Sequence, residues 1–125
     1  MRIRLVIALF VSLLLFQAPI AQAADDQAVL IYLPLSDRRF GTKDELERLF
    51  KLEESIAQAV ASAKVGEHDG NEVGNGEFTI YCYGPSATKL FNAVKPVLSE
   101  SAYSRKIVVV VRHGGPGASE EKHRL

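Results

Sequence analysis

The stretch GEHDGNEVGNGEFTIYCYGPSA, Gly66 to Ala87, contains the pattern that decides the fold. Asn75-Gly76 lies between two short strand-like runs, and Asn-Gly is a strong local signal for a β-hairpin with a two-residue turn. The run before it, from about Asp69 to Val73, is polar, as in an edge strand. The run after it, Glu77 to Tyr83, alternates apolar residues with a threonine and two tyrosines. The stretch therefore predicts two paired antiparallel strands.

Upstream of this hairpin, the sequence predicts one strand and one helix. The run AVLIYL, Ala28 to Leu33, is short, apolar and followed by Pro34, which is typical of a buried strand. Thr42 and Glu45 have the spacing of a capping box, in which the glutamate side chain reaches back to the backbone of the cap residue. Apolar residues then recur every three or four positions up to about Lys64, so we expect a helix there.

Downstream of the hairpin, the sequence predicts a second helix and a last strand. Ser86 is the expected N-cap of this helix, and Pro96 should kink or end it. Lys106 to Val111 is the expected strand. The order βαββαβ predicts an α+β domain of the ferredoxin-like type, with a four-stranded antiparallel sheet in the order 4-1-3-2 and both helices on one face. We place this domain at residues 24–113 and a flexible polar tail at residues 114–125.

Residues 1–23 have the layout of a cleaved secretory signal peptide. Arg2 and Arg4 precede an apolar run, and the small residues Ala21-Gln22-Ala23 form the expected cleavage site. We therefore expect the mature protein to be periplasmic or extracellular, with no membrane attachment after cleavage. Removing Arg2 and Arg4 from the 15 basic residues leaves 13, against 15 acidic residues. This net negative charge argues against nucleic acid as a partner, because binding nucleic acid requires a basic surface.

Two resemblances bear on activity. The pieces D-G-N-E and Y-x-Y-G-P-x-A-x-x-L-F, between Gly66 and Phe91, resemble uncharacterised small exported bacterial proteins with a ferredoxin-like domain, which implies no known activity. The motif HGGPG, His113 to Gly117, resembles the oxyanion-hole loop of α/β-hydrolases of the proline iminopeptidase type. That fold also needs a G-x-S-x-G nucleophile elbow, which this sequence lacks. We therefore assign no catalytic residue and expect HGGPG to be a chemically idle strand end that runs into a Gly/Pro-rich breaker.

The run Glu67 to Glu72 is the densest group of potential ligands in the sequence. His68, Asp69 and Glu72 are candidate ligands for Ca²⁺ or a transition metal, although their spacing matches neither an EF-hand loop nor a helical zinc motif. A small metal-binding protein or enzyme that uses this loop is therefore the alternative function. The other interpretation is an ordinary Asp-Gly turn beside a charged edge strand, with no cofactor.

A candidate anion site follows from the predicted strand order. Arg38 and Arg39 precede the first helix, and Arg105 and Lys106 precede the last strand, which should neighbour the first. Basic side chains beside a helix N-terminus favour anion binding. Acidic residues in the same segments would neutralise much of this charge, so a solvated loop is the other interpretation.

A candidate partner surface follows from strand alternation. Cys82 alternates with Phe78 and Ile80, which should face the helices, so we expect a buried, inert thiol. Tyr32, Tyr81 and Tyr83 should then lie together on the helix-free face. Such a face suits an unknown protein partner or a homodimer, unless the tail or the mature N-terminus covers it. We therefore expect a small exported binding module, of which a periplasmic inhibitor or immunity-type protein would be one version.

Overall fold

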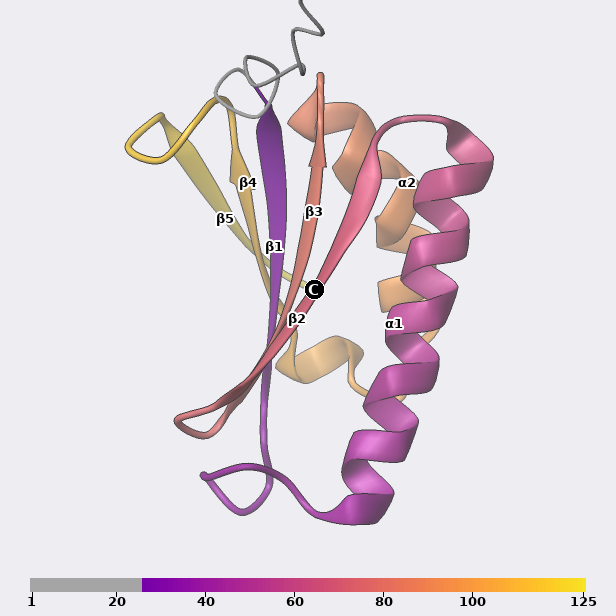
Figure 1. Ribbon diagram of the computed structural model, residues 1–125, viewed down its shortest axis with the longest axis vertical. Helices are drawn as coiled ribbons and strands as arrows, with labels where there is room; N and C mark the ends of the chain where they lie inside the picture. Colours follow the sequence, from indigo (N-terminus) through magenta and orange to yellow (C-terminus); the bar gives the residue numbers. More distant parts are fainter. Residues whose placement is uncertain (1–25) are drawn as a thin grey trace, which may run out of the picture.

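The computed structural model describes residues 26–125, and the expected signal peptide and its cleavage site lie outside the described residues. These residues form an α+β fold with one antiparallel sheet and two helices on one side of it (Figure 1). The elements are β1 Gln27–Pro34, α1 Lys43–Ala63, β2 Glu67–Gly74, β3 Glu77–Gly84, α2 Ala87–Glu100, the 3-10 helix η1 Ser104–Lys106, β4 Val108–Arg112 and β5 Glu120–Arg124. Neither helix in this part of the chain is long and apolar enough to cross a membrane.

The sheet has five strands, in the order β2-β3-β1-β4-β5, so the prediction of four strands is wrong. The extra strand, β5, lies in the segment that the sequence predicted as a flexible tail, and it pairs antiparallel with β4. Its sequence, EEKHR, has no apolar residue and therefore no alternation that would predict a strand. The strand is held by backbone pairing and by His123, whose ring stacks on Phe91 of α2 at 4.6 Å between centroids.

The β2–β3 hairpin forms as predicted and also anchors the loop that follows β1. Asn75 and Gly76 have φ values of 54° and 79°, as a two-residue turn of this kind requires. The backbone N–H of Leu35 donates to the Gly76 carbonyl oxygen, and the Gly76 N–H donates to the carbonyl oxygen of Arg39. A Cβ on Gly76 would lie 3.0 Å from the Arg38 carbonyl oxygen, so glycine permits this close approach.

Thr42 and Ser86 cap the two helices as predicted, but the Glu45 side chain of the expected capping box has a different partner. The Thr42 hydroxyl accepts a hydrogen bond from the Glu45 N–H at 3.2 Å, and the Ser86 hydroxyl accepts one from Lys89 N–H at 3.2 Å. The Glu45 carboxylate does not reach back to Thr42. It accepts hydrogen bonds from the backbone N–H and the hydroxyl of Ser36, at 3.0 and 2.8 Å, and so ties the loop after β1 to the first turn of α1. Helix α2 continues through Pro96 to Glu100, so Pro96 does not end the helix.

The main hydrophobic core fills the space between the sheet and the two helices. Every second residue of the central strands points into it, and α1 and α2 each contribute one apolar stripe. Its fully buried members include Val29, Ile31 and Leu33 of β1, Phe78, Ile80 and Cys82 of β3, Val109 and Val111 of β4, Leu49, Ile56 and Val60 of α1, and Leu90, Val94 and Leu98 of α2. This core fixes the sheet's two faces, because a shift of one residue would turn every side chain to the other side.

Candidate interaction surface and buried polar cluster

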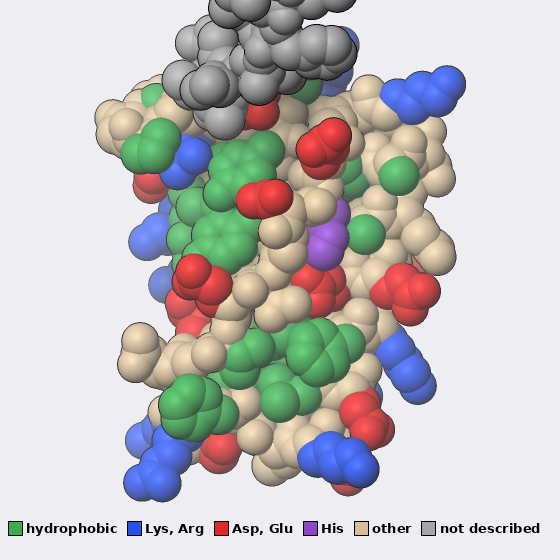
Figure 2. Space-filling view, viewed as in Figure 1, with side chains coloured by type: hydrophobic (Ala, Val, Ile, Leu, Met, Phe, Trp, Pro, Cys, Tyr) green, Lys and Arg blue, Asp and Glu red, His purple; other side chains and the backbone are tan. Residues whose placement is uncertain are grey.

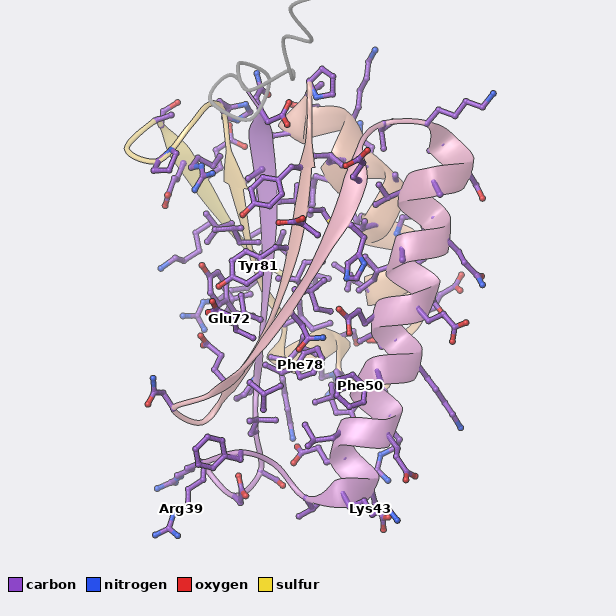
Figure 3. The ribbon with its side chains drawn as sticks, in the orientation of Figure 1. Arg39, Lys43, Phe50, Glu72, Phe78 and Tyr81 are labelled. Atoms are coloured by element: carbon purple, nitrogen blue, oxygen red, sulfur yellow. The ribbon has the colours of Figure 1, made fainter. Side chains whose placement is uncertain are left out.

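The three tyrosines singled out from the sequence lie together on the helix-free face. Tyr32 comes from β1, and Tyr81 and Tyr83 come from its neighbour β3. All three are partly buried and pack around Leu30 and Val110, which are 8% and 7% exposed. Figure 3 shows Tyr81 on the side of the sheet away from α1, whereas Phe78 of the same strand points toward Phe50 of that helix. Strand alternation thus predicted this grouping correctly.

Two of the tyrosines, Tyr81 and Tyr32, lie near carboxylates. The Tyr81 hydroxyl donates a hydrogen bond to the Glu72 carboxylate at 2.9 Å. Desolvation, together with this hydrogen bond to Glu72, raises the pKa of Tyr81 to about 12. Desolvation and the negative charges of Glu77 and Glu120 raise the pKa of Tyr32 as well. Both phenols therefore stay protonated at physiological pH and can donate hydrogen bonds.

The acidic and basic residues of this face lie on opposite sides of β1. On this face the two strands on one side, β2 and β3, carry the exposed carboxylates of Glu67, Glu72 and Glu77. The strands on the other side carry mostly cations. Lys106, Lys122 and Arg124 line an open hollow of about 580 Å³ beside Tyr32, together with the carboxylates of Glu77 and Glu120. Figure 2 shows apolar side chains over the sheet, with acidic side chains next to them and basic ones along the margin where β5 lies.

The structure does not bring the three candidate metal ligands together. His68 pairs in register with Cys82 and faces the helices, whereas Glu72 bonds Tyr81 on the other face. Asp69 lies between them at a β-bulge and is exposed. Within residues 26–125 no group of three histidine, cysteine or carboxylate side chains is placed to hold a metal ion. This separation argues against the predicted metal site.

His68 instead belongs to a polar cluster that the sequence analysis missed. Its Nε2 lies 2.6 Å from a carboxylate oxygen of Glu53, and the side-chain amide of Asn71 donates to both carboxylate oxygens, at 3.0 and 2.8 Å. Glu53 is 7% exposed on the inner side of α1. The available signal was its position, because Glu53 lies between Leu49 and Ile56 in the apolar stripe of the helix. A buried carboxylate needs such partners, which explains the polar residues on the inner side of β2.

Cys82 is buried beside this cluster and is not arranged as a nucleophile. Its side chain has no exposed surface. Desolvation, together with the negative charge of Glu53, raises the pKa of the Cys82 thiol to about 12. A reactive thiolate requires the opposite, an accessible and electropositive setting. The prediction that Cys82 faces the helices is confirmed.

The four residues of the predicted anion site lie in two separate segments. Arg38 and Arg39 belong to the loop that docks on the hairpin, where the Asp37 carboxylate accepts hydrogen bonds from the N–H groups of Arg39 and Gly41 at 2.8 and 2.9 Å. These two bonds lower the pKa of Asp37. Arg105 and Lys106 are exposed in η1, and Lys106 faces the hollow beside Tyr32. The anion site therefore stays a prediction.

The HGGPG motif forms the turn between β4 and β5. The N–H of His113 donates to the Ser119 carbonyl oxygen, and the N–H of Ala118 donates to the Gly115 carbonyl oxygen, both at 3.0 Å. Glu121 of β5 lies 3.4 Å from both His113 and His123 and links the two strands on the helix side. These contacts account for the motif as a structural hairpin.

The fold and its surface define a small α+β protein whose sheet is covered by helices on one face and carries a tyrosine cluster between acidic and basic margins on the other. No family model matches the chain, and neither a curated protein nor a solved structure does.

Proposed function

We propose that this chain is a small exported binding module, periplasmic or extracellular, that contacts another protein chain through its helix-free sheet face. A periplasmic inhibitor or immunity-type protein is one form that such a module takes. The strands β4-β1-β3-β2 with the two helices would form a ferredoxin-like βαββαβ unit, which β5 extends by one strand. The order of elements and the neighbouring of these strands support this proposal.

The observation that carries the proposal is the side-chain set on this face. Tyr32, Tyr81 and Tyr83 surround Leu30 and Val110, and charged residues surround this apolar centre. Protein interfaces combine an aromatic and apolar centre with a polar rim, and tyrosine is enriched among the residues that contribute most to binding. The segment that the sequence predicted as a flexible tail contains β5, which forms an edge of the sheet and does not lie across this face.

The face also suits a partner better than it suits a substrate. The hollow beside Tyr32 is open. The Tyr81 hydroxyl on this face contacts the Glu72 carboxylate, but its pKa is raised to about 12, so it stays protonated rather than acting as a nucleophile. The histidine and the cysteine that could supply chemistry, His68 and Cys82, are on the opposite face. We therefore favour binding over catalysis for this surface.

Site-specific photo-crosslinking in exporting cells tests the binding proposal. A benzophenone amino acid at position 81 should give a covalent adduct with a protein chain, identified by its mass. The same group at Phe40, which is 67% exposed in the loop after β1, is the control. An adduct specific to position 81 supports the proposal. Equal yields of adduct at both positions would contradict the proposal. A crosslink from position 81 that forms only within a single molecule would also contradict it.

Export is tested separately by the start of the mature chain. The small residues Ala21-Gln22-Ala23 after an apolar run lead us to expect a mature N-terminus at Ala24. N-terminal sequencing or the intact mass of protein recovered from the periplasm or the medium measures this directly. Recovery of the whole chain from the membrane fraction would contradict the export proposal.

A further inference from the structure

The helix-free face is charged in a way that selects its partner, if the proposed binding function holds. On the β2–β3 side of β1 the face carries the exposed carboxylates of Glu67, Glu72 and Glu77. On the β4–β5 side it carries Arg112, Lys122 and Arg124, with Lys106 just before β4, and one carboxylate, that of Glu120. One half of the face is therefore acidic, and the other half is mainly basic.

Among the described residues, the opposite charges of this face form no salt bridge with one another. In the part of the chain that the structure describes, the carboxylate ion pairs all involve histidines, and none includes a lysine or an arginine of this face. Arg112 is directed to a carbonyl oxygen, that of Gly114, at 2.9 Å. A partner that covers the face must therefore place cations over β2 and carboxylates over β5, because uncompensated charges are costly to desolvate.

A second copy of this chain meets that requirement in one orientation. Strand β1 is the middle strand of the five. A two-fold axis parallel to β1 and lying between two stacked sheets places β2 of one copy over β5 of the other, and β3 over β4. An in-plane axis perpendicular to β1 would place β2 over β2 and so bring like charges together. Charge complementarity therefore selects the parallel axis.

The strand register makes this complementarity specific to individual residues. Glu72 pairs with Thr79, Thr79 with Tyr32, Tyr32 with Val108, and Val108 with Arg124, so Glu72 and Arg124 are the two ends of one row across the sheet. The parallel two-fold axis exchanges the ends of every row. It therefore sets Glu72 of each copy opposite Arg124 of the other, and the axis generates this contact twice.

The other rows are mostly compatible with the same arrangement. The row through Tyr81, Leu30 and Val110 sets the tyrosine of one copy over Val110 of the other. The row through Tyr83 and Arg112 sets a guanidinium over an aromatic ring, a favourable cation–π geometry. The ends of that row, Glu67 and Glu120, repel. Stacked sheets lie about 10 Å apart, a gap that tyrosine side chains from both copies can fill.

We infer that two copies of this chain form a symmetric dimer by packing their helix-free faces together, with the two-fold axis parallel to β1 and Glu72 of each copy opposite Arg124 of the other. Two-fold dimers of this kind are the commonest closed oligomers, since a single self-complementary surface is enough to form them.

Complementary charge reversal tests this dimer with the whole chain after export. The variants Glu72→Lys and Arg124→Glu each create two repulsive contacts in their own dimer, so each should weaken self-association at least about tenfold. An equimolar mixture of the two variants restores attraction at both contacts, so it should form heterodimers as tightly as the wild type. Sedimentation velocity over a concentration series measures all three samples.

Two controls separate charge from folding. Glu54→Lys makes the same change at an exposed position of α1 and should leave the dimer intact. Glu77→Lys with Lys106→Glu repeats the mixing experiment in the adjacent row, in which Glu77 pairs with Pro34 and lines the hollow together with Lys106, in case Glu72→Lys unfolds the hairpin. Circular dichroism reports whether each variant keeps the wild-type fold.

The outcomes distinguish the dimer from the more general binding proposal. A wild type that stays monomeric up to about 1 mM, or folded variants whose mixture does not associate, would overturn the dimer. If the crosslinker at position 81 then captures a different protein, the binding proposal stands without the dimer. If the crosslinker captures neither another protein nor a second copy of this chain, both proposals fail.

Discussion

The two faces of β3 differ sharply in burial, although the residues that form them alternate along one strand. Phe78, Ile80 and Cys82 have no exposed surface and lie under the helices. Tyr81 and Tyr83 lie on the other face, partly exposed, beside a carboxylate that holds one hydroxyl. The difference shows that the helices complete one face as a dry core, whereas the other carries side chains with an apolar body and a polar end. Such residues are suited to a surface that is wet in one state and covered in another.

Thiol reactivity should give the largest contrast between the faces. With its pKa raised from 9.0 to about 12, Cys82 has roughly a thousandfold less thiolate than an ordinary cysteine near neutral pH, and its burial blocks access as well. Labelling by an aromatic disulfide should therefore be slower than in urea-unfolded protein by at least about a thousandfold. Rapid labelling under native conditions would mean that the helix side is not sealed.

Truncation of Phe78, on the helix side of β3, should cost far more stability than truncation of Tyr81 on the other face of the same strand. Phe78 is fully buried and contacts Phe50 edge to face at 5.7 Å, so Phe78→Ala should lower the unfolding free energy by about 3–5 kcal/mol. Val110 and Leu30 lose only part of their cover in Tyr81→Ala, which should cost about 1–2 kcal/mol. Urea denaturation of dilute protein measures both. If Phe78→Ala does not fold, Ile80→Val should still cost about 0.5–1.5 kcal/mol. Equal losses for Phe78→Ala and Tyr81→Ala would contradict the assignment of the faces.

The polar cluster inside the helix side should be the next most sensitive feature. Glu53→Ala leaves His68 and Asn71 without the carboxylate that both contact, so we expect a loss of about 1.5–3 kcal/mol. The neighbouring Glu54 is exposed, and Glu54→Ala should change stability by less than about 0.5 kcal/mol. Similar effects of the two substitutions in urea denaturation would show that the cluster does not stabilise the fold.

The Tyr81–Glu72 hydrogen bond should give the smallest effect and the one that depends on pH. Tyr81→Phe should cost about 0.5–1.5 kcal/mol near neutral pH. Because folding raises the pKa of Tyr81 from 10.0 to about 12, its stabilisation is fully present below the ordinary value and is lost as the pH rises through the folded one. The unfolding free energies of wild type and Tyr81→Phe should therefore converge in alkali. A difference that does not change with pH would exclude this contribution.

The sequence predicted the parts of the fold that local chemistry determines. Asn75-Gly76 supplied the positive φ values of the hairpin turn, and Thr42 and Ser86 supplied hydroxyl caps for the two helices. Alternation in β3 was enough to divide the tyrosines from the core residues. Each of these features depends on residues close together in the chain, which is why their pattern could be read without the structure.

The features that the sequence did not predict depend on partners far along the chain. Strand β5 is entirely polar, and its pairing with β4 becomes apparent only once the HGGPG turn has folded back. The Glu53–His68 contact joins residues of different elements, and the bulge at Asp69 sends His68 and Glu72 to opposite faces. A single extra residue in the strand thereby separated the expected metal ligands.

Oxidative footprinting of the tyrosines tests most directly whether the helix-free face is covered by another protein chain. The chain has 4 tyrosines, and Tyr103 is the internal reference because it lies elsewhere, packed beside the main core and contacting Arg48 at 3.3 Å. Hydroxyl-radical labelling in exporting cells is compared with labelling of dilute purified protein. We expect Tyr32, Tyr81 and Tyr83 to be protected together in cells, with Tyr103 unchanged. Equal labelling of the three in both samples, or matching protection of Tyr103, would contradict an interaction through this face.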